Sequence, residues 1–229
     1  MTFVFEPPPP ASVAIAGSDA RFPVRRIFCV GRNYAEHIRE MGNDPNEQPL
    51  FFTKPADAVV ESGAAIRYPP NTADWHHEVE LVIAIGKGGA SIEETAALDH
   101  IWGYGVGVDL TLRDRQAEAK KGGKPWDVAK AADNGAPISA LTPVEVCGHL
   151  SDARIWLSVN GETRQDANLN QMIWRTPAII ASLSRNWALK PGDLIFTGSP
   201  AGVGPIQRGD AITCGVEGLS ELRFSVLSA

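Results

Sequence analysis

The sequence has little cysteine, and its cysteines do not form the pattern of a disulfide framework or a zinc ribbon. Cys29, Cys147 and Cys214 are odd in number, far apart in the chain and outside the CxxC spacing. No apolar run approaches the roughly 18 residues of a membrane helix, and the proline-rich start lacks the basic residues of a signal peptide. The net charge is −6 without a long basic run, so neither nucleic acid nor a membrane surface is an expected partner. We expect a cytoplasmic protein with reduced thiols.

What the sequence does contain is an ordinary globular composition. Of its 229 residues, 44% are hydrophobic and 21% are charged, which argues against disorder and favours one domain with a sizeable core. Residues 1–24 are expected to form an extended lead-in, because four consecutive prolines favour polyproline II and cannot enter a sheet interior. Residues 25–229 are then expected to form a single domain.

Short elements are expected throughout this domain, because 22 glycines and 17 prolines are spread evenly along the chain. Apolar, β-branched segments predict strands at 25–31, 50–55, 64–69, 78–86 and 103–112, and a hairpin at 154–165 about Asn160-Gly161. Helices are expected at 35–42, at 91–101 with a capping box of Ser91 and Glu94, at 113–122 as a helix or loop, and from about Pro177. Strands outnumber helices, which predicts a mixed α+β, β-rich and mostly antiparallel fold with a few peripheral helices.

The densest polar cluster stands at the start of an apolar strand, in HHEVELVIAIG. Because side chains alternate along a strand, Glu78 and Glu80 point to the same face, about 7 Å apart. Two carboxylates on one face at an apolar strand repel each other unless a cation or a proton neutralises them. The pair is therefore either a solvated strand end or part of a site for a hard divalent ion such as Mg²⁺, Mn²⁺ or Ca²⁺.

A third carboxylate, Asp109, lies in the apolar, glycine-rich segment GYGVGVDLTL. A lone acid is costly to bury there, so Asp109 is either a turn residue or a partner of Glu78 and Glu80. Three converging carboxylates would form one face of an octahedral metal site, with water or substrate in the remaining positions.

Further polar residues suggest acid–base chemistry. His37 and Glu40 stand three residues apart in AEHIREMG, so on a helix they share a face and a carboxylate would orient an imidazole base, although exposed pairs of this kind are common. The polar residues that follow the Asp109 strand either bind an anionic substrate or are solvated, namely Arg113, Gln116, Lys130 and Asp133.

Together these segments resemble the fumarylacetoacetate hydrolase superfamily, and in particular its short acylpyruvase or fumarylpyruvate hydrolase branch. The resemblance extends from about residue 25 to 227 and rests on five ordered blocks: VGRNYAEHIREMG, FFTKPADAVV, HHEVELVIAIGK, GYGVGVDLTLRDRQ and PGDLIFTGSPAGVG. The first block, with the residues before it, is most similar to bacterial fumarylpyruvate hydrolases of gentisate degradation. The resemblance implies a mixed β-sandwich roll with peripheral short helices, commonly a homodimer.

The resemblance also implies site residues. Glu78, Glu80 and Asp109 would hold Mg²⁺ or Mn²⁺, with Ca²⁺ as a substitute, and His37 and Glu40 would activate water. Lys130 would stabilise the charge that grows on the attacked carbonyl oxygen, and closure of segment 35–48 would exclude bulk water. The implied substrate contacts are Gln116, Arg113, Thr197, Arg32 and Asn33.

The implied reaction is hydrolysis of the carbon–carbon bond of a 2,4-dioxo acid, with fumarylpyruvate yielding fumarate and pyruvate. Decarboxylation or tautomerisation of oxaloacetate on the same fold and metal site is the nearest alternative, and the sequence separates it poorly from hydrolysis. A non-catalytic β-domain that binds a metal or an anion is an alternative of another class.

Overall fold

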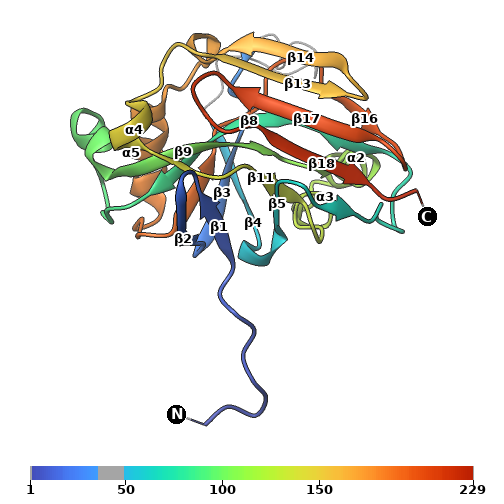
Figure 1. The fold of residues 1–229 in the computed structure, drawn as a ribbon, viewed down its shortest axis with the longest axis horizontal. Helices are drawn as coiled ribbons and strands as arrows, with labels where there is room; N and C mark the ends of the chain where they lie inside the picture. The colour runs from blue at the N-terminus through green and yellow to red at the C-terminus, as the bar shows by residue number, and fades with distance from the viewer. Residues whose placement is uncertain (1, 36–48, 229) are drawn as a thin grey trace.

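The computed structural model describes residues 2–35 and 49–228, and within these residues two large β-sheets stack on each other (Figure 1). One sheet has eight strands and the other has five, while short helices lie at their edges (Figure 1). A three-stranded sheet and a two-stranded hairpin complete the described strands. No helix among these residues has the length and apolar character of a bilayer-spanning segment.

The described elements are short, as the glycine and proline content predicts. The strands are β1 Ser12–Ile15, β2 Ser18–Pro23, β3 Arg26–Gly31, β4 Leu50–Lys54, β5 Val59–Glu61, β6 Ala65–Ile66, β7 Trp75–His77, β8 Val79–Ile85, β9 Ile101–Val108, β10 Thr111–Leu112, β11 Ala136–Ile138, β12 Thr142–Pro143, β13 Arg154–Val159, β14 Glu162–Asn168, β15 Asp193–Phe196, β16 Gly204–Ile206, β17 Ala211–Val216 and β18 Leu222–Val226. The helices are η1 Ala56–Ala58, η2 Glu94–His100, α2 Arg113–Lys121, α3 Asp127–Lys130, α4 Val144–Cys147, η3 Leu169–Gln171 and α5 Thr176–Asn186.

Strand β8 lies at the centre of the larger sheet, whose order is β4-β3-β15-β8-β9-β11-β5 with β12 beside β9. All seven residues of β8 are buried, because both faces of the sheet are covered. Leu81 and Ile83 pack into the core shared with the five-stranded sheet, whereas Val82 and Ala84 pack on the opposite face. Alternation along the strand therefore places Glu80 on the face that looks away from the five-stranded sheet.

The five-stranded sheet, of order β14-β13-β17-β18-β6, contains the predicted hairpin. Its turn residues Asn160 and Gly161 have φ angles of 52° and 81°, which is the left-handed conformation that Asn-Gly adopts in a two-residue hairpin turn. The predicted mixed, β-rich fold is confirmed. The pairing is mostly antiparallel, although the β3–β15, β5–β11 and β6–β18 pairs are parallel.

Two local predictions need correction. Part of the expected extended lead-in forms the β1–β2 hairpin, because Val13 and Phe22 are apolar and bury themselves against the larger sheet, and the residues before it extend away from the sheets (Figure 1). The capping box at Ser91 is absent: Ser91 has a φ of 49°, and the short 3-10 helix η2 begins later. The Ser91 N–H donates to the Ser184 carbonyl oxygen of α5 and the Ile92 N–H to the Ser184 hydroxyl, and these bonds hold the segment instead.

The helix predicted from Pro177 is confirmed, since α5 carries this proline in its first turn. Residues 113–122, left open between helix and loop, form helix α2 almost throughout. The helix predicted at 35–42 lies, beyond its first residue, outside the described residues.

Candidate active site

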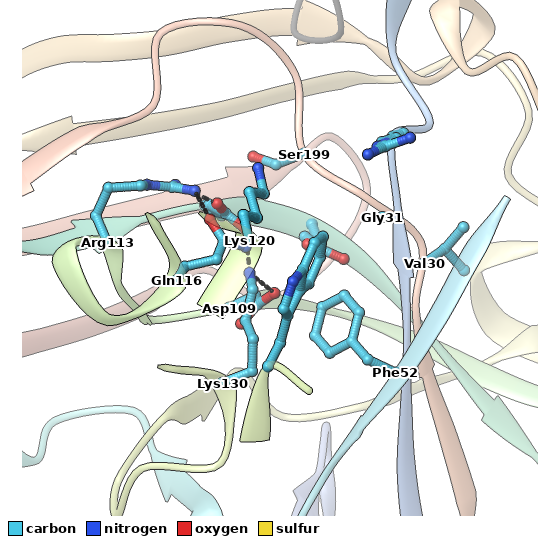
Figure 2. A pocket seen from close by; sticks show the side chains of 13 residues that line it. Val30, Gly31, Phe52, Asp109, Arg113, Gln116, Lys120, Lys130 and Ser199 are labelled. Atoms are coloured by element: carbon cyan, nitrogen blue, oxygen red, sulfur yellow. Dashed lines mark hydrogen bonds and ion pairs between the residues drawn. The ribbon is translucent and has the colours of Figure 1, made fainter. Parts of the chain in front are cut away.

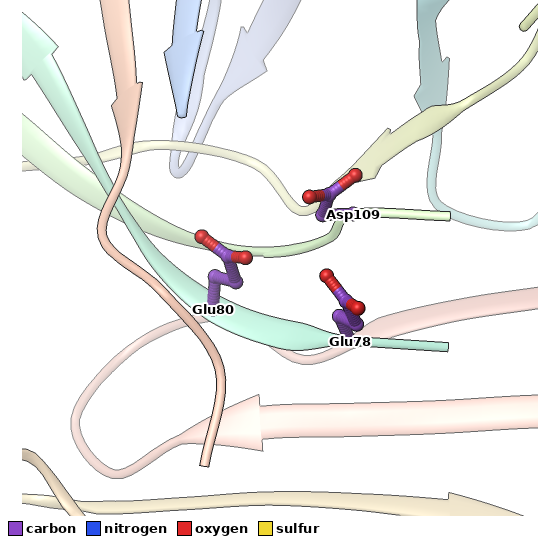
Figure 3. Close-up of side chains that lie close together, drawn as sticks. All are labelled: Glu78, Glu80 and Asp109. Carbon is purple, nitrogen blue, oxygen red and sulfur yellow. The ribbon is translucent and has the colours of Figure 1, made fainter. Parts of the chain in front are cut away.

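Three buried carboxylates converge at one end of the larger sheet (Figure 3). Glu78 stands between β7 and β8, Glu80 lies on β8, and Asp109 follows β9. The antiparallel register pairs Val79 with Val108, and the Asp109 N–H donates to the Glu78 carbonyl oxygen at 2.8 Å, so Asp109 lies opposite Glu78. Glu78, Glu80 and Asp109 are only 6%, 2% and 0% exposed, and one carboxylate oxygen from each lies within 4.8 Å of the other two.

Buried cations partly neutralise this cluster. The Lys130 ammonium donates to Glu78 Oε2 at 2.7 Å and to Asp109 Oδ2 at 2.6 Å. Lys54 lies 2.8 Å from Asp109 Oδ1, and the Arg113 guanidinium donates to Glu78 Oε1. Glu80 instead accepts the Gly198 N–H at 2.6 Å, and among the described residues no Lys or Arg pairs with it. Glu80 is therefore the carboxylate of the cluster that nearby cations neutralise least.

The electrostatics support that conclusion. Burial, followed by the charges of Asp109 and Glu78, raises the pKa of Glu80 well above its ordinary value. Burial alone would lower the pKa of Lys130, but Asp109 and Glu78 outweigh it and the pKa lies above the ordinary value. Lys130 is therefore a permanent cation, whereas Glu80 needs another positive charge to ionise fully.

A hard divalent ion fits this donor set. All three candidate ligands are carboxylates, the oxygen donors that Mg²⁺ and Mn²⁺ prefer. One oxygen from each carboxylate lies within 4.8 Å of the others, so a single ion between them would be within reach of all three side chains. Three protein ligands also leave coordination positions for water or substrate.

A narrow cavity of about 40 Å³ opens onto the carboxylates, and we call it the inner cavity (Figure 2). Its walls combine cationic, amide, hydroxyl and aromatic side chains. It is lined by Val30, Gly31, Arg32, Phe52, Glu78, Glu80, Asp109, Arg113, Gln116, Lys120, Trp126, Lys130 and Ser199. Arg113, Gln116 and Lys120 come from helix α2, and the Arg113 guanidinium donates to Gln116 Oε1 at 2.6 Å. This cationic wall suits an anionic substrate beside a metal.

The structure brings together most of the residues named from the sequence. Those that line the inner cavity are Glu78, Glu80, Asp109, Lys130, Gln116, Arg113 and Arg32. Asn33 and Thr197 do not line it: Asn33 Nδ2 donates to the carbonyl oxygens of Thr197 and Trp174, and the Thr197 hydroxyl donates to the Leu81 carbonyl oxygen. These two side chains hold neighbouring loops in place. His37 and Glu40 lie outside the described residues.

Sequence reasoning missed several residues of this site, among them Lys54 and Ser199. Lys54 ends the apolar strand β4, and a lysine inside LFFTKP was the available signal for a buried cation. Ser199 lines the inner cavity two residues beyond Thr197, within the same TGSP segment. Its Oγ accepts a hydrogen bond of 2.8 Å from the buried side chain of Gln165, whose position on β14 of the other sheet no local pattern indicates.

Comparisons with known proteins agree with this architecture. The family model described as fumarylacetoacetate (FAA) hydrolase C-terminal matches residues 26–227. The chain belongs to this family. The predicted membership is therefore confirmed, and the family relatives below are named as enzymes.

A solved relative is similar over its whole length. The crystal structure of fumarylpyruvate hydrolase from Pseudomonas aeruginosa was solved in complex with Mn²⁺ and pyruvate. Its sequence is 48% identical to this chain, the TM-score is 0.97, and the match covers 100% of both chains. That structure confirms the predicted fold and shows that a fumarylacetoacetate hydrolase relative binds a divalent ion.

Curated relatives carry other activities in their names. Mitochondrial oxaloacetate tautomerase FAHD1 from Arabidopsis thaliana is 43% identical, covering 88% of this chain and 90% of the relative. Mitochondrial oxaloacetate decarboxylase from Dictyostelium discoideum is 42% identical, covering 89% and 94% respectively. These names contradict the expected cytoplasmic location. The expectation rested on free cysteines and on the lack of an apolar segment, and it was wrong because neither feature distinguishes one reducing compartment from another.

Proposed function

We propose that this chain is a metal-dependent hydrolase of acylpyruvates, with fumarylpyruvate as its substrate. The similarity to the P. aeruginosa fumarylpyruvate hydrolase supports this proposal over the full chain. The observation that carries it is a second cavity of about 510 Å³, which we call the outer cavity. It is lined by Arg32, Leu50, Phe51, Phe52, Thr53, Lys124, Pro125, Trp126, Asp127, Lys130 and Trp187.

The two cavities share part of their walls, since Arg32, Phe52, Trp126 and Lys130 line both. A substrate whose dioxo acid end lies at the carboxylates therefore has room to extend its acyl group into the outer cavity. Fumarylpyruvate has such an acyl group, whereas the four-carbon oxaloacetate leaves the outer cavity unfilled. The size and position of the outer cavity thus favour a longer acylpyruvate.

Glu78, Glu80 and Asp109 would hold Mg²⁺ or Mn²⁺, with Ca²⁺ as a substitute. When bound, the ion supplies Lewis-acid polarisation of the substrate's oxygens. Arg113 and Gln116 present a guanidinium and an amide to a substrate carboxylate at the cavity wall. They therefore orient the substrate.

The remaining steps belong to proton transfer and charge stabilisation. His37, assisted by Glu40, takes a proton from water, and the water oxygen bonds to the carbonyl carbon of the acyl group. The carbon–carbon bond to the pyruvate half then breaks, releasing the acyl group as a carboxylic acid and the other half as pyruvate after protonation. The permanent charge of Lys130 stabilises the negative charge that develops on the attacked oxygen.

A second candidate function is tautomerisation or decarboxylation of oxaloacetate. The identities of 43% and 42% to the A. thaliana and D. discoideum relatives favour it. Both reactions need an anion-binding wall beside a carboxylate cluster, so the inner cavity is compatible with either. The reactions differ in their chemistry: hydrolysis adds water as the carbon–carbon bond breaks, decarboxylation releases carbon dioxide, and tautomerisation breaks no carbon–carbon bond.

The deciding experiment compares fumarylpyruvate, acetylpyruvate and oxaloacetate by loss of enol absorbance, with Mg²⁺ or Mn²⁺ and with chelator, while products are identified. We expect metal-dependent release of pyruvate, fastest from fumarylpyruvate. His37→Ala is expected to retain metal binding and to lose hydrolysis, because the general base is gone. Full activity of this variant would refute the role of His37, and turnover of oxaloacetate alone would transfer the function to the second candidate.

A further inference from the structure

The outer cavity has aromatic walls and one cation that the inner cavity lacks. At the boundary the ring centroids of Phe52 and Trp126 lie 6.0 Å apart, and on the far wall those of Phe51 and Trp187 lie 6.3 Å apart. Such surfaces favour burial of an unsaturated carbon chain. Lys124 lines the outer cavity but not the inner one, so its ammonium is placed to meet the part of a substrate that extends into the outer cavity.

Positive charge dominates this boundary. Arg32 and Lys130 line both cavities, Arg113 and Lys120 line the inner cavity beside it, and Lys124 lines the outer cavity. Asp127 is the single acid among the described residues that line the outer cavity, and it forms no ion pair with Lys124. An anion that enters the outer cavity therefore meets a cationic surface.

The backbone holds Lys124 at this place. Helix α2 ends before Gly122, and Gly123 has a φ of 60°, a left-handed conformation that ends the helical path just before Lys124. The Lys124 N–H donates to the Ala119 carbonyl oxygen at 2.9 Å, while the residue stays exposed. Within the described part of the chain no carboxylate forms an ion pair with the Lys124 ammonium, so this group is available to a ligand.

We propose that Lys124 is a specificity-determining residue that binds a second, distal carboxylate of the substrate and so selects acylpyruvates whose acyl group ends in a carboxylate. This inference rests on the proposed hydrolase function. The inner cavity orients the dioxo acid end, the aromatic walls cover the unsaturated chain, and Lys124 meets the charge at its far end. Acetylpyruvate, which ends in a methyl group, lacks that interaction.

The test measures kcat and KM for fumarylpyruvate and acetylpyruvate in the wild type, in Lys124→Met and in Lys124→Arg. Methionine keeps the length of the side chain but removes the charge. We expect the ratio of kcat/KM for fumarylpyruvate to that for acetylpyruvate to fall about tenfold in Lys124→Met, mainly through a higher KM for fumarylpyruvate. Lys124→Arg should restore most of the ratio, because a cation is present again.

Lys121→Met is the matched control, because Lys121 is also an exposed lysine near the end of α2 but lines neither cavity. In Lys121→Met the ratio of kcat/KM for fumarylpyruvate to that for acetylpyruvate should equal the wild-type ratio. An unchanged ratio in Lys124→Met, with wild-type hydrolysis of fumarylpyruvate intact, would overturn the inference and leave the proposed function standing. Failure of the wild type to hydrolyse either acylpyruvate would overturn both.

Discussion

Lys54 and Lys130 show how single residues make a buried cluster of acids tolerable. Both ammonium groups lie against Asp109, and Lys54 also donates to the carbonyl oxygens of Leu110 and Lys130. A buried charge without a partner is far more costly than a buried pair. The two lysines therefore stabilise the buried carboxylate cluster when no metal is bound.

Replacing Lys54 by methionine should destabilise the chelator-treated protein by about 3–5 kcal/mol, because the Asp109 carboxylate loses a buried partner. Chemical denaturation followed by circular dichroism measures this change. Arg154→Met is the control: its pair with Asp166 is exposed, so the unfolding midpoint should stay close to that of the wild type. Equal midpoints for Lys54→Met and the wild type would contradict the role given to Lys54.

At the scale of elements, strand β9 depends on the absence of side chains at alternate positions. A Cβ atom on Gly103 would lie 2.4 Å from the Thr142 carbonyl oxygen of β12, and one on Gly107 would lie 2.6 Å from the Phe196 ring of β15. The strand packs closely against its neighbours for this reason. Its position in turn sets that of Asp109, which follows its last residue.

Gly103→Ala should therefore lower the free energy of unfolding by about 1–3 kcal/mol, since either β12 or β9 must shift. Thermal unfolding followed by circular dichroism tests this. Gly204→Ala makes a suitable comparison, because the nearest atom to its new Cβ is His77 Nε2 at 3.7 Å. If both variants unfolded at the same temperature, close packing would not explain the glycine in β9.

At the scale of the whole molecule, the stacked sheets bury the apolar side chains that lie between them. Cys29 and Cys214 have no exposed surface, and burial raises the pKa of both thiols. Cys147 is partly exposed, and burial also raises its pKa. Because the thiolate is the reactive form, even the accessible thiol should react slowly near neutral pH.

Iodoacetamide should consequently modify Cys147 alone in the native protein and all three cysteines after denaturation. The rate at Cys147 should keep rising beyond pH 9, because its raised pKa means that less thiolate is present at any given pH. Intact mass spectrometry counts the modifications, and Cys147→Ser should leave the native protein unmodified. Rapid native modification of Cys29 or Cys214 would show that the sheets open more readily than their packing indicates.

Local patterns in the sequence determined much of this protein. The Asn160-Gly161 turn, the helix from Pro177 and the apolar strand after Glu78 depend on neighbouring residues, so their chemistry is visible in the sequence itself. The shared face of Glu78 and Glu80 follows in the same way from strand alternation, and the five ordered blocks indicated the family.

The tertiary structure alone decided which distant residues meet. Asp109 lies opposite Glu78 because of the β8–β9 register, and Lys54 reaches the cluster from β4 although it is far away in the sequence. The capping box at Ser91 failed for the same reason, since contacts with α5 outweigh a local propensity. Sequence patterns report what adjacent residues prefer, whereas a buried charge or a cavity is stabilised by partners that only the packing of the whole chain assembles.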